Sequence, residues 1–371
     1  MRILHVCQPT DGGAAVVVRS LVEAGVAAGD EVTVACPGDG YLRSWVVAAG
    51  ARWLDLPLTR SPRLSDFTHA WQLREMVRSV DVVHAHSSKA GVVSRVAAFS
   101  LGGRRPRVVF TPHGWSWYAA GRAAGVCARF ERLAGRVTDI IIVVSRSELR
   151  DGRAVLDPAA SMELITNGVD TAAFAPFGPT ASRPSGPLLV QVGRLSVQKG
   201  QDRSVRALRC LAGLQAHLRL VGTGPQRHQL EVLARDLGVK DRVEFVGSVD
   251  PRPHLRAADI VLLPSRWEGM SLAMLEAMSI GRAIIAADCG GSEALYDCGV
   301  LIGNTDDETA VRNLAGGIRE LLDDDERRAR LGQAARRRAE TDFPFSQTLR
   351  GYQRVWQAPP AGQASWGGTH A

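Results

Sequence analysis

Two glutamates with seven residues between them form the strongest chemical signal in the sequence. Glu268 and Glu276 follow the apolar segment Asp259–Pro264 and lie where a helix is predicted to open. Gly269 permits a tight backbone turn at that point. Because the unpaired N–H groups and the dipole of a helix N-terminus attract negative charge, the sequence predicts an anion site. The amides expected to serve it belong to Met270, Ser271 and Leu272.

Glu276 has mostly apolar neighbours at helical spacing. The residues three and four positions away are Leu272, Ala273, Ser279 and Ile280. A carboxylate on a buried helix face is costly unless it has partners. We therefore expect Glu276 to bind a ligand hydroxyl, and the alternative is a solvated helix face.

Arg194 and Lys199 follow a second apolar segment, Leu188–Val192, with Gly193 directly before the arginine. An arginine can hold two oxygens at once and a lysine supplies a point charge, which suits a diphosphate. The alternative is a pair of exposed surface bases. The position at the carboxyl end of a predicted strand, beside glycines, favours the binding site.

Glycine and histidine mark two strand ends in the first half. Gly13 follows the segment Arg2–Cys7, where it serves either a simple turn or a close approach of backbone to phosphate. His113 follows Arg107–Thr111 and is interpreted as a functional residue rather than a satisfied loop histidine. His84 and His86 also end a strand, but their spacing alone supports no metal site.

Short apolar runs alternate with helical patterns along the whole chain, which predicts α/β architecture with parallel sheets. We expect two Rossmann-like, doubly wound domains facing across a cleft, with ligands beyond the carboxyl ends of the strands. Strands are predicted at Arg2–Cys7, Glu31–Ala35, Arg52–Leu56, Asp81–His84, Arg107–Thr111, Asp139–Val144, Leu188–Val192, His217–Val221, Arg242–Val246, Asp259–Leu263 and Ala283–Ala287.

Composition shifts suggest where the domains end. We expect an N-terminal domain over 1–170, a Pro/Gly/Ser-rich linker over 171–186 and a C-terminal domain over 187–340. A helix over 341–356 is expected to pack back toward the N-terminal domain, and 357–371 to be disordered.

Together these motifs resemble the retaining glycosyltransferases of the GT-B fold in family 4, glycosyl transferases group 1. The spacing of Glu268 and Glu276, with Arg194 and Lys199 upstream, makes the resemblance specific, and it covers roughly residues 1–355. Further matching segments are Gly12–Gly13, Thr111–Gly114, Ser145, Asn167–Asp170, Leu220–Pro225 and Phe245–Gly247.

The resemblance implies that the domain over 1–170 binds the acceptor and that the domain over 187–340 binds the nucleotide sugar. It also implies a role for each of these residues. Glu276 would bind the ribose hydroxyls and Glu268 the hydroxyls of the transferred sugar. Arg194 and Lys199 would hold the diphosphate. The amides of Met270–Leu272 would contact the sugar or the phosphate, and Val246 would line the pocket of the base. His113 would lie over the sugar.

The expected reaction moves a hexosyl or N-acetylhexosaminyl group, with retention, from a UDP-sugar such as UDP-GlcNAc or UDP-glucose to an acceptor hydroxyl. We expect neither a cofactor nor a metal ion, since no aspartate pair for a divalent ion is evident and protein charges would replace it. The alternatives are a nucleotide-sugar epimerase, which needs no acceptor, and a non-catalytic scaffold that binds sugar nucleotides.

Composition bounds the partners and the compartment. The net charge of +7 is spread along the chain, without the aromatic-interleaved basic stripe of nucleic-acid binders, so no nucleic-acid partner is expected. Without a signal or an apolar span, the chain is predicted to be cytoplasmic. The acceptor is expected to be a small molecule or lipid-linked, in bacterial cell-surface polysaccharide, glycolipid or natural-product biosynthesis. The aromatic segment Trp115–Tyr118, with the arginines after it, suggests peripheral membrane contact or stacking on an acceptor.

Overall fold

The computed structural model describes residues 1–59, 63–211 and 213–358. The chain divides into two compact units, the first containing Met1–Thr166 together with the residues from Thr348 onward, and the second containing Asn167–Gln347. The segment 171–186, interpreted from the sequence as a linker, groups with the second unit. Of the predicted tail over 357–371, the residues from 359 onward lie outside the described part.

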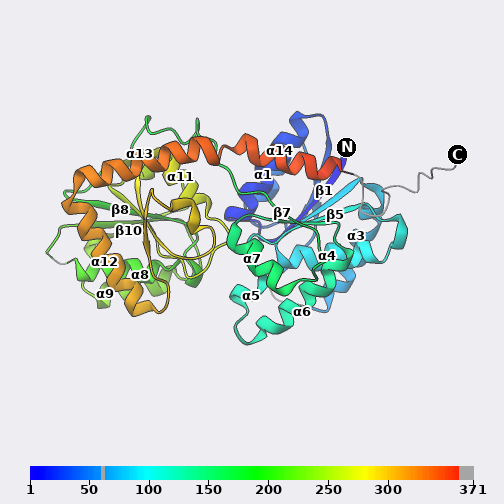
Figure 1. The fold of residues 1–371 in the computed structure, drawn as a ribbon, viewed down its shortest axis with the longest axis horizontal. Coiled ribbons are helices and arrows are strands. Elements are labelled where there is room, and N and C mark those ends of the chain that lie inside the picture. The colour runs from blue at the N-terminus through cyan, green and yellow to red at the C-terminus, as the bar shows by residue number, and fades with distance from the viewer. Residues whose placement is uncertain (60–62, 212, 359–371) are drawn as a thin grey trace. The chain divides into compact units, whose positions relative to one another are not determined.

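The first unit is built on a parallel sheet of seven strands in the order β3-β2-β1-β4-β5-β6-β7 (Figure 1). Strand β1 lies between β2 and β4, so the chain reverses its direction of winding at this point. The strands are β1 (Arg2–Cys7), β2 (Glu31–Cys36), β3 (Arg52–Asp55), β4 (Val82–His86), β5 (Arg107–Thr111), β6 (Ile140–Val143) and β7 (Met162–Leu164).

Helices cover both faces of this sheet, which is why its central strands are apolar on both sides. On one face Leu4 and Val6 of β1 pack against helices α3 and α4, and on the other Cys7 packs against α1 and α2. Helix α14 adds Trp356, which is buried. The helices are α1 (Gly13–Ala27), α2 (Leu42–Ala48), α3 (Ser65–Ser79), α4 (Ser88–Phe99), α5 (Ser116–Ala119), α6 (Ala124–Ala134), α7 (Arg146–Val155) and α14 (Phe345–Gln357).

The second unit repeats this plan with a parallel sheet of six strands in the order β10-β9-β8-β11-β12-β13. Its core joins the apolar side chains of the central strands to those of α8, α9 and α12. The strands are β8 (Leu188–Val192), β9 (His217–Val221), β10 (Val243–Gly247), β11 (Ile260–Leu263), β12 (Ala283–Ala287) and β13 (Val300–Ile302). The helices are α8 (Gln201–Cys210), α9 (Arg227–Asp236), α10 (Arg252–Ala257), α11 (Leu272–Ile280), α12 (Asp307–Asp323) and α13 (Asp325–Asp342).

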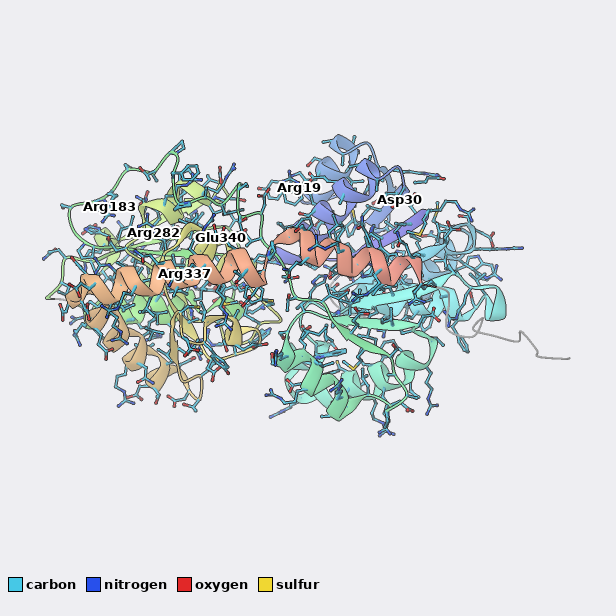
Figure 2. The ribbon with its side chains drawn as sticks, turned by 45° about the horizontal axis from the view of Figure 1, so that its top comes forward. Arg19, Asp30, Arg183, Arg282, Arg337 and Glu340 are labelled. Atoms are coloured by element: carbon cyan, nitrogen blue, oxygen red, sulfur yellow. The ribbon has the colours of Figure 1, made fainter. Side chains whose placement is uncertain are left out.

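The outer helices of the second unit carry charged side chains into solvent, as Arg337 and Glu340 of α13 do (Figure 2). Among the described helices, none is both long enough and apolar enough to cross a bilayer.

Two doubly wound α/β units are therefore present, as predicted. Strands β1, β5, β8, β9 and β12 have the predicted bounds, and the other predicted strands differ by one or two residues at one or both ends. Strands β7 and β13 were not predicted, because runs of three residues are too short to show a period.

Candidate active site

The second unit has its change of winding direction between β8 and β11, which are neighbours in the sheet. The loops after two such neighbouring strands run in opposite directions, which opens a crevice at the carboxyl ends of the strands. Ligands bind in this crevice in open α/β sheets. The loop after β8 carries Arg194 and Lys199, and the loop after β11 carries Glu268. The two strongest sequence motifs are thus brought to one edge.

Glutamine and glycine position the loop after β8. The Gln191 side chain donates to the Lys199 carbonyl at 2.8 Å and accepts from Ser204 Oγ at 2.7 Å. Gly200 has a φ of +66°, and a Cβ atom on it would lie 2.2 Å from the carbonyl oxygen of Pro264. Any other residue at position 200 would clash with this carbonyl oxygen. Glycine therefore lets the loop after β8 pack against the end of β11.

Lys199 and Glu268 form an ion pair at this edge. Lys199 Nζ lies 2.5 Å from Glu268 Oε1, and Ser265 Oγ donates to the same oxygen at 2.7 Å. Both charged side chains are largely withdrawn from solvent. The charge of Lys199 is therefore balanced by Glu268, whose second carboxylate oxygen, Oε2, lies outside these contacts.

The backbone around Glu268 is fixed by neighbours to which the sequence interpretation gave no role. A Cβ atom on Gly290 would lie 2.0 Å from the Glu268 carbonyl oxygen, and one on Gly291 would lie 2.8 Å from the Gly269 carbonyl oxygen. Asn167 Nδ2 donates to the Met270 carbonyl at 2.9 Å. The tandem glycines that begin three residues after the predicted strand Ala283–Ala287 were the available signal, since the carboxyl ends of neighbouring strands meet at one edge.

Helix α11 begins at this edge, as predicted. Ser271 is its N-cap residue and Leu272 its first residue, so the amides of Met270–Leu272 lie at the helix N-terminus. The Ser271 hydroxyl is buried and has no hydrogen-bond partner among the described residues. A polar group in this state is suited to receive a ligand.

Glu276 lies one turn further along α11 and is half-buried. In the part of the chain that the structure describes, its carboxylate has no hydrogen-bond or ion-pair partner. Burial, and to a lesser degree the negative charge of Asp250, raises the pKa of Glu276 to about 7, while the positive charge of Lys199 opposes this rise. A carboxylate held without partners is suited to accept hydrogen bonds from ligand hydroxyls.

Gly193, Arg194 and Val246 complete the residues predicted at this edge. The φ of Gly193 is +150°, and the Arg194 carbonyl accepts a hydrogen bond from Gln201 Nε2 at 3.0 Å. The pairing of β10 with β9 shifts between Phe245 and Gly247, which leaves Val246 out of the register. Such an irregularity frees backbone groups at a sheet edge.

Gly13 and His113 belong to the first unit. Gly13 opens α1, behind Gly12 with a φ of +78°. His113 follows β5 with a φ of +52°, and its Nε2 lies 3.1 Å from His86 Nδ1. Burial lowers the pKa of His113 to about 4, so its ring is neutral near pH 7.

The prediction that Trp115–Tyr118 could face a membrane is wrong for its leading aromatic residue. Trp115 is buried, donates from Nε1 to the Glu148 carbonyl at 2.9 Å, and stacks on Trp117 with ring centroids 4.5 Å apart. Tyr118 donates its hydroxyl to Asp151 at 2.7 Å. These aromatic side chains hold α5 to α7 instead.

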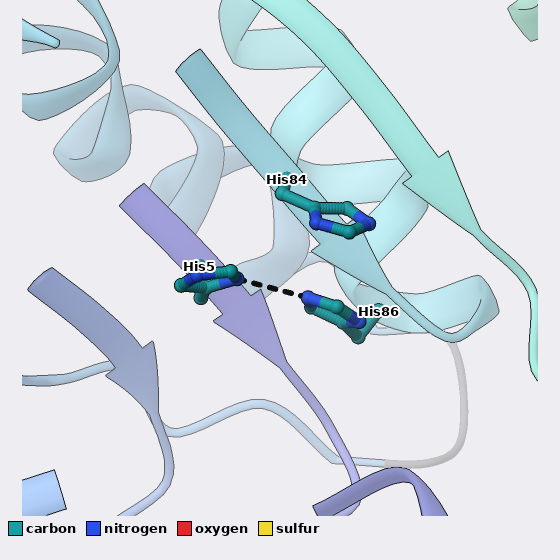
Figure 3. Close-up of side chains that lie close together, drawn as sticks. All are labelled: His5, His84 and His86. Carbon is teal, nitrogen blue, oxygen red and sulfur yellow. Dashed lines mark hydrogen bonds between the residues drawn. The ribbon is translucent and has the colours of Figure 1, made fainter. Parts of the chain in front are cut away.

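Three buried histidines of the first unit place their ring nitrogens close enough to be considered for a metal ion. His5 comes from β1, and His84 and His86 come from β4 (Figure 3). Their hydrogen bonds, described below, decide whether nitrogen lone pairs remain for an ion.

The fold and the edge motifs place the chain among the GT-B glycosyltransferases. A sequence model described as Glycosyl transferases group 1 matches residues 177–338, and one described as Glycosyltransferase Family 4 matches residues 11–173. The chain therefore belongs to glycosyltransferase family 4.

Relatives of known activity are similar over most of the chain. A GDP-mannose-dependent alpha-(1-6)-phosphatidylinositol monomannoside mannosyltransferase of Mycobacterium tuberculosis is 31% identical over 294 residues, 71% of this chain and 73% of the relative. A UDP-Gal:alpha-D-GlcNAc-diphosphoundecaprenol alpha-1,3-galactosyltransferase of Escherichia coli is 32% identical over 235 residues, 58% of this chain and 59% of that one. The solved structure of Anabaena HepE with UDP and glucose aligns with a TM-score of 0.83 at 21% identity, covering 97% of this chain and 100% of HepE, which supports the fold.

Proposed function

We propose that the chain is a retaining glycosyltransferase that takes a hexosyl or N-acetylhexosaminyl group from a nucleoside-diphosphate sugar held by its second unit. The observation that carries the proposal is the pairing of Lys199 with Glu268 at the β8–β11 edge, beside Arg194 and the start of α11. This edge gathers two cations, a helix N-terminus and two carboxylates, which match the diphosphate and the hydroxyls of such a donor.

Bond cleavage places negative charge on the departing diphosphate. Arg194, Lys199 and the amides of Met270–Leu272 would stabilise that charge because they are already oriented before the reaction begins. A donor phosphate would compete with Glu268 for the Lys199 ammonium, and the carboxylate would turn to the sugar hydroxyls. Glu276 would accept the ribose hydroxyls, and Val246 would contact the base. No metal ion is required by this distribution of charge.

The acceptor hydroxyl would attack from the side on which the diphosphate leaves, and the leaving phosphate would take the proton. This course retains the anomeric configuration and needs no protein nucleophile. His113 would act on the transferred sugar, a role that derives from the family resemblance.

The identity of the base is open to a direct test, since one relative uses GDP-mannose and another UDP-galactose. We favour a UDP-sugar. Calorimetry and thermal shift with UDP-glucose, UDP-N-acetylglucosamine and GDP-mannose would rank the donors. Tighter binding of GDP-mannose would reject the preference for uridine while leaving the class of donor intact.

The decisive test is transfer. The donor that binds best would be incubated with phosphatidylinositol mannosides and a diphosphoundecaprenol-linked sugar, the acceptors that the names of these two relatives suggest. Product NMR would show whether the anomeric configuration matches that of the donor. An inverted product would overturn the mechanistic class. Isomerised donor without an acceptor would favour the epimerase, and binding without turnover the scaffold.

We also propose that the first unit touches an anionic membrane where its acceptor is lipid-linked. The outward side of α6 exposes Val126, Leu133 and the arginines at 129 and 132, while Glu131, the acidic residue of that helix, is buried. Among the described residues Arg129 and Arg132 have no acidic partner. A basic face with apolar side chains favours anionic headgroups.

Vesicle flotation tests this face. The protein should float with vesicles rich in phosphatidylglycerol and not with pure phosphatidylcholine, and the double variant R129E/R132E should lose the binding. The matched control R206E/R209E reverses two exposed arginines of α8. Equal loss in the control, or no binding by the wild type, would reject the α6 face.

A further inference from the structure

A chain of hydrogen-bonded histidines runs through the first unit and ends at His113. His5 Nδ1 lies 3.0 Å from His86 Nε2, and His86 Nδ1 lies 3.1 Å from His113 Nε2. These residues come from β1, β4 and the loop after β5, which are consecutive in the sheet, and Figure 3 shows the contact between His5 and His86. The chain thus leads from the buried sheet to its carboxyl edge.

His84 supports this chain from the side and leaves no lone pair for a metal ion. Trp356 Nε1 lies 3.2 Å from His84 Nδ1, and because an indole can only donate, His84 Nδ1 must accept. The proton of His84 is then on Nε2, which lies 2.9 Å from Thr111 Oγ1. Both nitrogens are occupied, so the cluster of His5, His84 and His86 is not suited to metal binding in this arrangement.

The direction of the His5–His86–His113 chain follows from its buried end. His5 Nε2 is buried and has no hydrogen-bond partner among the described residues. An orphaned buried N–H is rarer in proteins than an unused acceptor, which places the proton of His5 on Nδ1. His5 then donates to His86, and His86 donates from Nδ1 to His113 Nε2. This order leaves the proton of His113 on its Nδ1.

We infer that His5 and His86 are positioning residues, which hold His113 as the Nδ1–H tautomer so that it donates a hydrogen bond to a hydroxyl oxygen of the transferred sugar. The inference rests on the proposed function for the identity of that ligand. His113 Nδ1 has no partner in the described part of the chain, and the ring is half-buried. A ring fixed at Nε2 loses less freedom when Nδ1 meets its ligand.

Burial favours the neutral state of all three imidazole rings in the His5–His86–His113 chain. The pKa of His5 is lowered to about 3 and that of His113 to about 4, and the pKa of His86 is also lowered well below its ordinary value. No acidic side chain hydrogen-bonds to these rings among the described residues. The three rings therefore share protons by hydrogen bonding alone, as a positioning device requires.

The first test reads the tautomer directly in the wild-type protein. Long-range ¹H–¹⁵N correlation on ¹⁵N-histidine-labelled protein, with H113N to assign the signal, should show His113 protonated at Nδ1 and bare at Nε2 near pH 7. Protonation at Nε2 would overturn the inference. In H86L the signal should change to a mixture of tautomers, and an unchanged signal would also overturn it.

The second test separates positioning from folding. H86L should lower kcat by about tenfold to a hundredfold with a smaller change in donor KM, the scale of a misplaced group. H86Q should recover part of that loss, because its amide can accept from His5 and donate to His113. Full activity in H86L, or equal loss in H86Q with an unchanged Tm, would reject the positioning role. The matched control is H228L, at an exposed histidine of α9.

Failure of this inference is distinguishable from failure of the proposed function. Full activity of H113A would remove His113 from the reaction and with it the ligand proposed here. If H113A lost transfer activity while H86L kept it, the proposed role of His113 would stand and only the histidine chain would be rejected.

Discussion

Lys199 and Glu268 form an ion pair of 2.5 Å although they are 69 positions apart in the sequence. A close pair that is largely withdrawn from solvent is sensitive to the loss of either partner, because the remaining charge keeps its desolvation cost. Here the pair lies at the sheet edge where a diphosphate would arrive. The lysine can therefore exchange one anionic partner for another without leaving its place.

This exchange predicts the effect of removing the lysine. Lys199→Ala should lower kcat by about 10²–10³, the scale of losing one donor that stabilises developing negative charge. Donor affinity should fall less, since the proposed contact of Lys199 with the diphosphate would strengthen as the bond breaks. Steady-state kinetics and calorimetry on the same preparation would measure both. The control is Lys240→Ala, which removes an exposed lysine elsewhere in the second unit. A loss of affinity alone would make Lys199 a binding residue.

Arg194 should resist even its most conservative replacement. Arg194→Lys keeps the charge and loses the planar fork that would hold two phosphate oxygens, so kcat/KM should fall about 10–100-fold, the equivalent of about 1.5–3 kcal/mol for a charged hydrogen bond. Arg206→Lys, at an exposed position of α8, should retain full activity. Kinetics of Arg194→Lys indistinguishable from the wild type would exclude a bidentate contact.

Gly290 should be intolerant of a single methyl group. In Gly290→Ala the new Cβ atom would lie 2.0 Å from the Glu268 carbonyl oxygen, so the loop after β11 must move. We expect a loss of about 1–3 kcal/mol in the free energy of unfolding together with a lower transfer rate. Gly316→Ala provides the control, because a Cβ atom there meets nothing within 4 Å. Unchanged stability and activity in Gly290→Ala would contradict the packing described here.

Metal independence is a separate consequence of the proposed charge distribution. Transfer should survive exhaustive EDTA treatment, because Arg194, Lys199 and the start of α11 would supply the positive charge that a divalent ion supplies elsewhere. Activity lost to EDTA and restored by Mg²⁺ or Mn²⁺ would refute this view of the diphosphate site.

The sequence predicted the fold well because its evidence was local and repeated. Apolar runs such as Leu188–Val192 and His217–Val221 coincide with β8 and β9, and glycines marked the turns after them. Parallel strands buried on both faces produce such continuous runs.

The candidate site was predicted only in part, because its decisive contacts are long-range. Local patterns identified Arg194, Lys199 and Glu268, whereas their pairing depends on Gly200 meeting the end of β11. The support from Asn167 and from Gly290 is equally non-local. Trp115 was misplaced for the same reason. The arginines that follow it in the sequence suggested an exposed position, whereas tertiary packing buries it.

The last prediction concerns Glu276, whose pKa is raised to about 7 mainly by burial. In the proposed donor site a ribose hydroxyl would donate to the ionised carboxylate, so donor affinity should rise with pH between about 6 and 8 as the proton is lost. UDP-glucose or GDP-mannose is the proper probe, because the esterified diphosphate does not titrate in this range. Glu276→Gln should bind the donor more weakly by about 1.5–3 kcal/mol at pH 8, and its affinity should change little across the range.

The same shift has the opposite effect on folding. The raised pKa means that the folded protein binds the proton more tightly than the unfolded chain, where the value is 4.5. The proton on Glu276 therefore stabilises the folded protein. This contribution is fully present below about pH 4.5 and is lost as pH rises through 7. Without ligand, Glu276→Gln should therefore be more stable than the wild type at pH 8, by about 1–2 kcal/mol in the free energy of unfolding measured by denaturant titration. The expected difference is no larger because the carboxylate is partly exposed to solvent. The difference should shrink toward pH 5. Weaker donor binding combined with greater stability would identify Glu276 as a carboxylate kept for its ligand, whereas a variant less stable at every pH would make it a structural residue of α11.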